Sequence, residues 1–267
     1  ARVRHWSLAL IAKELRLQQL TVVLFGLFAA GWAAVLLVPQ VFETASRALI
    51  PLMMLYSALL SILIGSLAIA EERHLGTMDF QLLMPVAIWK QWLVKAGVAF
   101  ALAATLGILV PMLMRVFLPV GPVAGSFAMW RSHALLVLIM TSTSLYVSSL
   151  SSSGVRAAVM SVPAIFGLML LVQVISLVLR RAYRSPFHMW AGSIIPVHLR
   201  DEVLRAVTWI PLALAALLAL TMLCLAFRNY RRGERTVRRI AFQGLCVAAV
   251  VVLVLTAEFL AAAVAVR

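Results

Sequence analysis

Long apolar runs separated by short polar segments are the dominant pattern along the chain. An α-helix rises about 1.5 Å per residue, so about 20 apolar residues cross a bilayer core about 30 Å thick. Seven runs approach or exceed this length, the last of them continuing past Glu258: 17–42, 48–70, 96–114, 134–155, 157–179, 206–227 and 240–257. The pattern predicts an all-α membrane protein, a polytopic bundle of transmembrane helices.

Composition supports the same class. Hydrophobic residues make up 64% of the 267 residues and charged residues only 12%, about half the share expected of a soluble domain. Mean hydropathy is +1.06. The first apolar run is too long for a secretory signal peptide and lacks a small-residue cleavage site in the right place, so we expect it to be a span. Cys224 and Cys246 both fall within predicted spans and do not imply a disulfide scaffold.

The positions of lysine and arginine orient the spans. With the N-terminus in the cytoplasm, the internal segments carry most of the basic residues, most clearly the arginine cluster at 228–239. Five arginines fall in one predicted external loop and oppose this orientation: Arg180, Arg181, Arg184, Arg200 and Arg205. Because cytoplasmic loops retain an excess of basic residues, we predict a multi-pass protein of the cell (inner) membrane with a cytoplasmic N-terminus. Topology and attraction to the lipid bilayer then explain the net charge of +14, and no nucleic-acid partner is expected.

Residues 1–16 form a polar segment before the first run. Val3, Trp6, Leu10 and Leu17 can share one helical face, and the remaining positions carry the charged residues Arg2, Arg4, Lys13, Glu14 and Arg16. Tryptophan among basic residues is typical of a helix that lies in the membrane interface. We therefore predict an N-terminal amphipathic interfacial helix at 1–16, with Trp6, Lys13, Glu14 and Arg16 as its interface residues. The alternative is a polar lead-in to the first span.

The segment 71–95, EERHLGTMDFQLLMPVAIWKQWLVK, is a long polar-containing stretch between the second and third predicted spans. Apolar residues recur at helical spacing on each side of Pro85: Leu75, Met78 and Leu82 before it, and Val86, Trp89 and Leu93 after it. Proline suits the first turn of a helix, and Gly76 allows a sharp turn after the acidic pair. The segment is thus predicted to form a helical hairpin at the cytoplasmic surface, made of two short amphipathic helices.

At these residues the chain resembles the permease subunits of type-2 ATP-binding cassette exporters. Their loop between the second and third spans typically reads Glu-Arg-x-x-Gly-Thr, a Leu-Leu pair, Pro-Val, an aromatic residue four positions after the proline and a lysine ten after it. The matching residues here are Glu72, Arg73, Gly76, Thr77, Leu82, Leu83, Pro85, Val86, Trp89 and Lys95. The leucine pair lies about one position later than usual, and His74 stands where an acidic or polar residue is frequent.

Two further stretches resemble the same family: IAKELR at 11–16, like its N-terminal connecting helix, and SSLSSSGVRAA at 148–158, like the turn between its fourth and fifth spans. The family's unit has six spans. The resemblance therefore implies a six-span permease domain at 17–230, followed at 231–267 by a basic linker and an additional C-terminal span.

The resemblance also implies partners and a mechanism. In such exporters the first cytoplasmic loop is a coupling helix that docks on a separate cassette ATPase, present in two copies, and ATP and Mg belong to that subunit. A second permease, the same or a related chain, completes the path. The implied coupling residues are Glu71, Glu72, Arg73, Gly76, Thr77, Met78, Leu82, Leu83 and Pro85. Glu71, Glu72 and Arg73 are expected to contact the ATPase or the N-terminal helix; the alternative is that they are solvated residues flanking a span.

Sequence motifs for catalysis are missing. The chain has no Gly-x-x-x-x-Gly-Lys-Ser/Thr phosphate loop, so no cofactor is expected in it and we expect no enzyme activity of its own. An intramembrane enzyme is a less favoured alternative, because the five histidines form no i, i+4 pair and no Gly-x-Ser-x-Gly turn occurs. A membrane anchor or signalling subunit with a permease-like fold is the other alternative.

Two remaining features bear on the path. The loop at 180–205 is predicted to be external and either to dip back into the membrane, as in the family, or to be a plain solvated loop. Small hydroxyl residues in the fourth predicted span, among them Thr141, Ser144 and Ser148, favour close helix packing over substrate contact. No substrate-binding residue is assigned.

Overall fold

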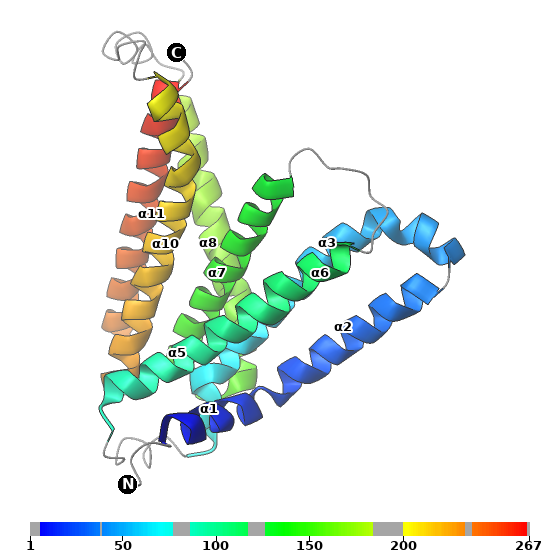
Figure 1. Ribbon diagram of the computed structural model, residues 1–267. Coiled ribbons are helices and arrows are strands. Elements are labelled where there is room, and N and C mark those ends of the chain that lie inside the picture. The colour runs from blue at the N-terminus through cyan, green and yellow to red at the C-terminus, as the bar shows by residue number, and fades with distance from the viewer. Residues whose placement is uncertain are drawn as a thin grey trace.

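The computed structural model describes residues 6–37, 39–76, 86–116, 126–183, 200–232 and 237–265, and all regular secondary structure in these ranges is helical (Figure 1). The elements are α1 (Trp6–Leu17), α2 (Gln19–Leu37), α3 (Pro39–His74), α5 (Ile88–Ala104), the π-helix η2 (Thr105–Leu109), α6 (Val110–Val116), α7 (Ser126–Leu150), α8 (Gly154–Tyr183), α10 (Arg200–Arg232) and α11 (Val237–Ala265). The predicted all-α class is confirmed.

Five helical segments of the described part are long and apolar enough to cross a membrane. They are Pro51–His74, Ile88–Met114, Met129–Leu150, Gly154–Ile175 and Arg238–Thr256. The consecutive helices α1 and α2 pass the same test together but are bent by 59°, which would make a sixth span. The predicted run at 206–227 lies within α10, whose side chains at 200–212 are outside the described part. The chain is therefore a multi-span helical membrane protein.

One predicted span boundary is wrong. The expected break between the first two spans was at 43–47, but α2 ends at Leu37 and α3 then runs without interruption for 36 residues from Pro39. Proline suits the first turn of a helix because its missing N–H has no intrahelical acceptor there. The polar residues Glu43 and Arg47 interrupt the hydropathy of the chain, but neither of them breaks a helical backbone.

The predicted hairpin at 71–95 is also corrected at both of its described ends. Glu71, Glu72 and Arg73 belong to the last turn of α3, and Leu75 and Gly76 form a turn after it. After the predicted break at Pro85, the helix begins at Ile88 and continues into the third span, so no separate short helix exists there. The residues from 88 to 104 include no proline, and nothing in this stretch would end the helix. Residues 77–85 lie outside the described part, together with the helix predicted for Met78 and Leu82.

The central contact of the bundle is between α3 and α7, and it depends on small residues. A Cβ on Gly65 of α3 would lie 2.7 Å from the Ser144 Cβ and 2.8 Å from the Thr141 carbonyl oxygen, so only glycine permits this approach. One turn further on, the Ser148 hydroxyl donates to the Ser66 carbonyl at 2.7 Å and accepts from the Ala70 N–H at 2.9 Å. The hydroxyl is thus inserted into a backbone hydrogen bond of α3. The packing role predicted for the small hydroxyl residues of the fourth span is confirmed.

A π-helix interrupts the third span, and Pro111 explains it. Proline has no N–H, so the carbonyl of Gly107, four residues earlier, loses its helical donor. Two side chains from neighbouring helices replace that donor. The Ser57 hydroxyl of α3 and Nε2 of His133 of α7 each donate to the Gly107 carbonyl at 2.8 Å. The irregular turn is therefore fixed by both central helices.

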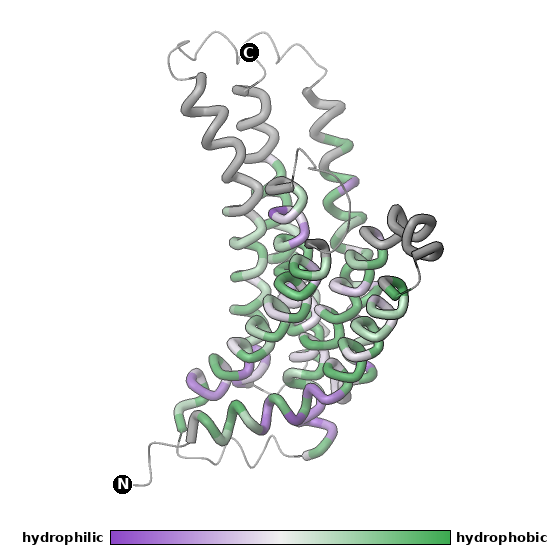
Figure 2. The backbone as a smooth tube through the Cα atoms, turned by 45° about the vertical axis from the view of Figure 1, so that its right-hand side comes forward, coloured by the Kyte–Doolittle hydropathy of each residue, from purple (hydrophilic) through white to green (hydrophobic). Residues whose placement is uncertain are grey.

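One end of the bundle gathers the polar residues. Figure 2 shows hydrophilic residues concentrated near α1 at this end and hydrophobic residues along the spans. The end of α3, the start of α5, the α7–α8 turn, the end of α10 and the start of α11 all lie at the same end as α1 (Figure 1). We call this end the foot of the bundle.

Candidate functional site: a buried ion-pair cluster at the foot

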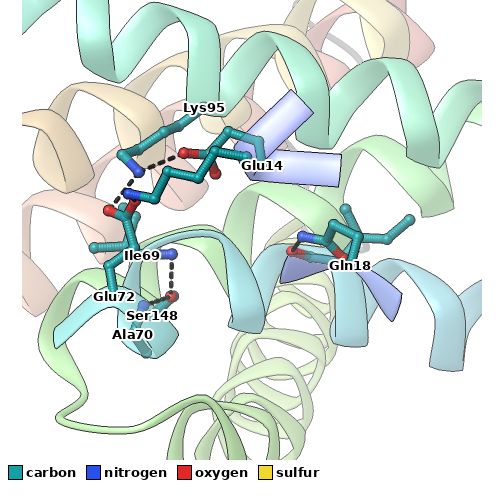
Figure 3. Close-up of polar contacts among 9 residues, drawn as sticks. Glu14, Gln18, Ile69, Ala70, Glu72, Lys95 and Ser148 are labelled. Atoms are coloured by element: carbon teal, nitrogen blue, oxygen red, sulfur yellow. Dashed lines mark hydrogen bonds and ion pairs between the residues drawn. The ribbon is translucent and has the colours of Figure 1, made fainter. Parts of the chain in front are cut away.

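Four charged side chains from three helices meet at the foot. Nζ of Lys13 lies 2.6 Å from Oε1 of Glu72, and Nζ of Lys95 lies 2.7 Å from Oε1 of Glu14. Lys95 also forms an ion pair with the other carboxylate oxygen of Glu72 (Figure 3). We call Lys13, Glu14, Glu72 and Lys95 the ion-pair cluster. It joins α1, the end of α3 and the beginning of α5.

Three of the four side chains are withdrawn from solvent. The side chains of Glu72 and Lys95 are 0% and 1% exposed, Glu14 is also buried, and only Lys13 remains 33% exposed. Moving one charge into a protein interior costs several kcal/mol unless a partner compensates it. Here two carboxylates face two amines, so the formal charges cancel. Such a cluster resists separation of its helices.

The position of each residue on its helix explains the meeting. Leu10, Glu14 and Gln18 follow one another at intervals of four residues, so α1 turns a single face towards the bundle. Gln18 continues the contact where α1 bends into α2: its side-chain amide donates to the Ile64 carbonyl at 3.2 Å, and the Thr21 hydroxyl donates to its Oε1 at 2.8 Å. The buried face of α1 is therefore largely polar.

This arrangement corrects the expected amphipathic orientation of the N-terminal helix. Glu14 was placed with the polar residues of the interface, but it is buried against α5, while Leu8 and Leu15 are exposed. The reason is that its partner Lys95 lies inside the protein, and the ion pair with Lys95 offsets the cost of taking the carboxylate out of water. Arg16 is exposed, and the side chain of Trp6 lies outside the described part.

The residues next to Glu72 tie α3 to the α7–α8 turn. Nη1 of Arg73 donates to the Ser149 carbonyl at 2.7 Å. The Glu71 carboxylate lies over the first residue of α8, because a Cβ on Gly154 would be 2.5 Å from Glu71 Oε2. A negative charge is stabilised at that end of a helix, where backbone N–H groups are free. Glu71, Glu72 and Arg73 thus all make contacts inside this chain, and Glu72 makes the contact with the N-terminal helix.

Beside the cluster, the ends of the α3–α5 connection carry exposed apolar side chains. Leu75 is 56% exposed and Trp89 is 54% exposed, and Nζ of Lys90 lies 5.5 Å from the centre of the Trp89 ring. Gly76 has a φ of +65°, the left-handed conformation that glycine adopts without strain. The sharp turn expected there is present. The other predicted coupling residues lie outside the described part: Thr77, Met78, Leu82, Leu83 and Pro85.

A second polar group at the foot was not predicted. Gln243 of α11 donates from Nε2 to Oδ1 of Asn229 of α10 at 2.7 Å, and its Oε1 accepts from the Tyr146 hydroxyl of α7 at 3.0 Å. Asn229 also donates to the Ser149 hydroxyl at 3.2 Å. The available signal was an isolated amide near the start of an otherwise apolar run. Lys95 was likewise recognised only as part of the motif, without a role, because its partners are 81 and 23 residues away in sequence.

The chemistry of the ion-pair cluster is structural. Each carboxylate is held by an amine, and each amine by a carboxylate, so none of the four is a free base or nucleophile. Among the described residues no three His, Cys, Asp or Glu side chains are grouped so that they could hold a metal ion. The arrangement can fix three helices together and can transmit a displacement among them.

No protein-family model matches the chain, and no curated protein or solved structure matches it either.

Proposed function

We propose that this chain is the membrane-spanning permease subunit of an ATP-binding cassette exporter. In this proposal it pairs with a second permease, the same or a related chain, to enclose the path. Two copies of a separate ATPase, which hold ATP and Mg, drive it through the α3–α5 connection. The chain itself carries no hydrolytic activity.

The observation that supports this function best is the ion-pair cluster. Glu72 lies at the α3 end of the connection and Lys95 near its α5 end, and Lys13 and Glu14 bind both of them to α1. Separating the three helices would expose or strand buried charges, so they move together. A push on the connection is then passed to the second and third spans and to α1, as a coupling element requires.

The surface around the connection also fits a docked partner. Leu75 and Trp89 expose large apolar side chains on either side of it, and Gly76 forms a left-handed turn directly after α3. Large apolar residues and tryptophan are typical anchors at protein interfaces. The resemblance of 71–95 to the coupling loop of cassette permeases supplies the identity of the partner.

Site-specific crosslinking tests the proposal. A photoreactive residue is placed at Trp89 or at Leu75. The control position is Leu37, which is exposed at the C-terminal end of α2. The expected product at positions 89 and 75 is an adduct with a protein that is labelled by a photoreactive ATP analogue, and no such adduct forms at position 37. The copurified complex, reconstituted in vesicles, should hydrolyse ATP faster than the ATPase alone.

Other outcomes distinguish the alternatives. An ATP-binding adduct without stimulation of hydrolysis would favour a membrane anchor or signalling subunit with a permease-like fold. Failure to form any ATP-binding adduct at positions 75 and 89 would reject the permease assignment. Substrate turnover by the chain alone would favour the intramembrane enzyme.

A further inference from the structure

A buried polar network joins α11 to the centre of the bundle. The side-chain amides of Gln243 and Asn229 form a reciprocal pair: Gln243 Nε2 donates to Asn229 Oδ1 at 2.7 Å, and Asn229 Nδ2 donates to Gln243 Oε1 at 3.2 Å. Gln243 Oε1 also accepts from the Tyr146 hydroxyl of α7 at 3.0 Å. Both amides are buried. Each amide therefore fixes the orientation of the other, and burial limits the competition from water for these hydrogen bonds.

The network continues through Ser149, in the last turn of α7, to the end of α3. The Ser149 hydroxyl accepts from Asn229 Nδ2 at 3.2 Å, and the Ser149 carbonyl accepts from Arg73 Nη1 at 2.7 Å. That carbonyl is among the last four of α7, which have no N–H donor within their own helix, so Arg73 satisfies it. Ser149 thus binds α10 with its side chain and α3 with its backbone.

Apolar packing attaches the same end of α10 to α5. The rings of Trp92 and Phe227 meet edge to face, with 5.4 Å between their centroids. One turn further along α10, Tyr230 is buried in the hydrophobic core that also contains Ile69 of α3, and Trp92 packs against this core. The end of α10 therefore shares a core with both helices that lead into the α3–α5 connection.

The hold of this network on α3 depends on Gln243. The packing of α11 in the described part is mainly against α10 and α8, so the Gln243 amide is a polar link from α11 towards α7 and α3. Without that amide, the buried Asn229 oxygen would lose a donor. Buried polar atoms are almost always hydrogen-bonded, so the Asn229 side chain would be driven to turn away from Ser149 in search of another partner.

We propose that Gln243 is a positioning residue for the end of α3. It holds the Asn229 amide on Ser149, and Ser149 in turn holds Arg73. In this way α11 sets the position at which α3 ends and the α3–α5 connection begins. The positioning needs only this chain, whereas its consequence for coupling to an ATPase rests on the proposed function. The proposal gives a role to the C-terminal span, which the resemblance to a six-span unit leaves without one.

Hydrogen exchange of the full chain in lipid nanodiscs tests the positioning without any partner. Gln243→Leu should speed amide exchange about tenfold in the last turns of α3 and α7, which corresponds to about 1.4 kcal/mol of lost local stability. Thr256→Val is the matched control on α11, because the Thr256 hydroxyl donates to the Val252 carbonyl of its own helix at 2.7 Å. It should change neither stretch. Faster exchange confined to α10 and α11 in the Gln243→Leu chain would overturn the proposal.

Two further variants separate the proposed link from a general loosening. In an Arg73→Met chain, adding Gln243→Leu should no longer change exchange at the end of α3, although it should still change exchange at the end of α7. Ser149→Ala removes the hydroxyl that accepts from Asn229 and keeps the carbonyl that accepts from Arg73. It should therefore reproduce the effect at the end of α3 even if Gln243→Leu folds poorly. An undiminished effect in the Arg73→Met chain, or no effect of Ser149→Ala, would contradict the link.

ATP hydrolysis by the reconstituted complex measures the consequence for coupling. Gln243→Leu should lose most of the stimulation while the ATPase still copurifies, and Thr256→Val should keep it. Full stimulation by the Gln243→Leu chain would refute the role in coupling. Absence of stimulation by the wild-type chain would instead count against the proposed function, and hydrogen exchange would still decide the positioning.

Discussion

At the scale of single residues, Lys95 is a buried charge that depends on its neighbours in the ion-pair cluster. Its side chain is 1% exposed and its amine faces two carboxylates, Glu14 and Glu72. An ion pair in this setting is not a large net source of stability, because desolvation offsets most of the attraction. Its loss, however, is costly, because removing the amine leaves Glu14 buried without its ion-pair partner, close to Glu72, which keeps Lys13.

Lys95→Met should therefore lower the free energy of unfolding by about 3–5 kcal/mol. Lys90→Met is the matched control, because Lys90 is exposed and only lies over the Trp89 ring, a contact that contributes about 0.5–1 kcal/mol at such a site. Reversible unfolding by denaturant in mixed micelles measures both. Glu14→Gln should recover part of the loss in the Lys95→Met background, because it removes the buried carboxylate that has lost its partner. Similar losses in the two single variants would show that the cluster does not hold the helices.

At the scale of elements, the sequence predicts which segments are helical more reliably than it predicts the residues at which each helix begins and ends. Hydropathy located the spans at 96–114, 134–155, 157–179 and 240–257 because lipid selects continuous apolar surface. It misplaced the start of α3, because polar residues in a helix alter hydropathy without breaking the backbone.

The interior of the site could be predicted only in part. The family-like motif at 71–95 includes Glu72, Arg73 and Lys95, and the second family-like stretch, at 11–16, includes Lys13 and Glu14. The sequence does not show that Lys95 pairs with Glu14 and Glu72, because these residues are far from it along the chain. The prediction of an amphipathic helix also assumes that charged side chains face water. Glu14 violates that assumption, because its partner Lys95 is inside the protein.

The π-helix in the third span provides a test of how elements are fixed to one another. Either Ser57 or His133 alone can satisfy the Gly107 carbonyl that Pro111 leaves free. Ser57→Ala or His133→Leu should each cost about 1 kcal/mol from the carbonyl hydrogen bond, whereas the double variant should lose about 1–3 kcal/mol more than the sum, since the buried carbonyl is then unsatisfied. Ser61→Ala is the control: it is equally buried, but its hydroxyl donates to the Ser57 carbonyl within the same helix. Strict additivity in the double-mutant cycle would reject this account of the bulge.

The turn after α3 provides an element-scale test of coupling. Gly76 has a φ of +65°, which proline cannot adopt and asparagine tolerates. Gly76→Pro should reduce the stimulation of ATP hydrolysis by the permease while membrane insertion is unchanged, and Gly76→Asn should retain most of it. The measurement is ATPase activity of the reconstituted complex against that of the ATPase alone. Equal stimulation with proline and asparagine would mean that the geometry of the connection does not matter for coupling.

At the scale of the whole molecule, charge and architecture agree on one end of the bundle. The ion-pair cluster, the α7–α8 turn, the end of α10 and the start of α11 all lie at the foot, although they are far apart in sequence (Figure 1). The orientation predicted from basic residues therefore concerns a single end of the bundle. If the foot faces the cytoplasm as predicted, the ends of α3 and α5 lie on the side where the proposed ATPase would bind.

Accessibility labelling tests this orientation directly. The native Cys224 and Cys246 are first replaced by serine, and a single cysteine is introduced either at His74, exposed at the end of α3, or at Gly121, in the segment that joins α6 to α7. A membrane-impermeant maleimide should label position 121 in intact cells and leave position 74 unlabelled, and inverted vesicles should show the reverse. The physical reason is that an odd number of crossings separates the two positions, while the basic foot is retained on the cytoplasmic side. Labelling of position 74 from outside intact cells would put the connection beyond the reach of any nucleotide-driven partner and would reject the proposed coupling.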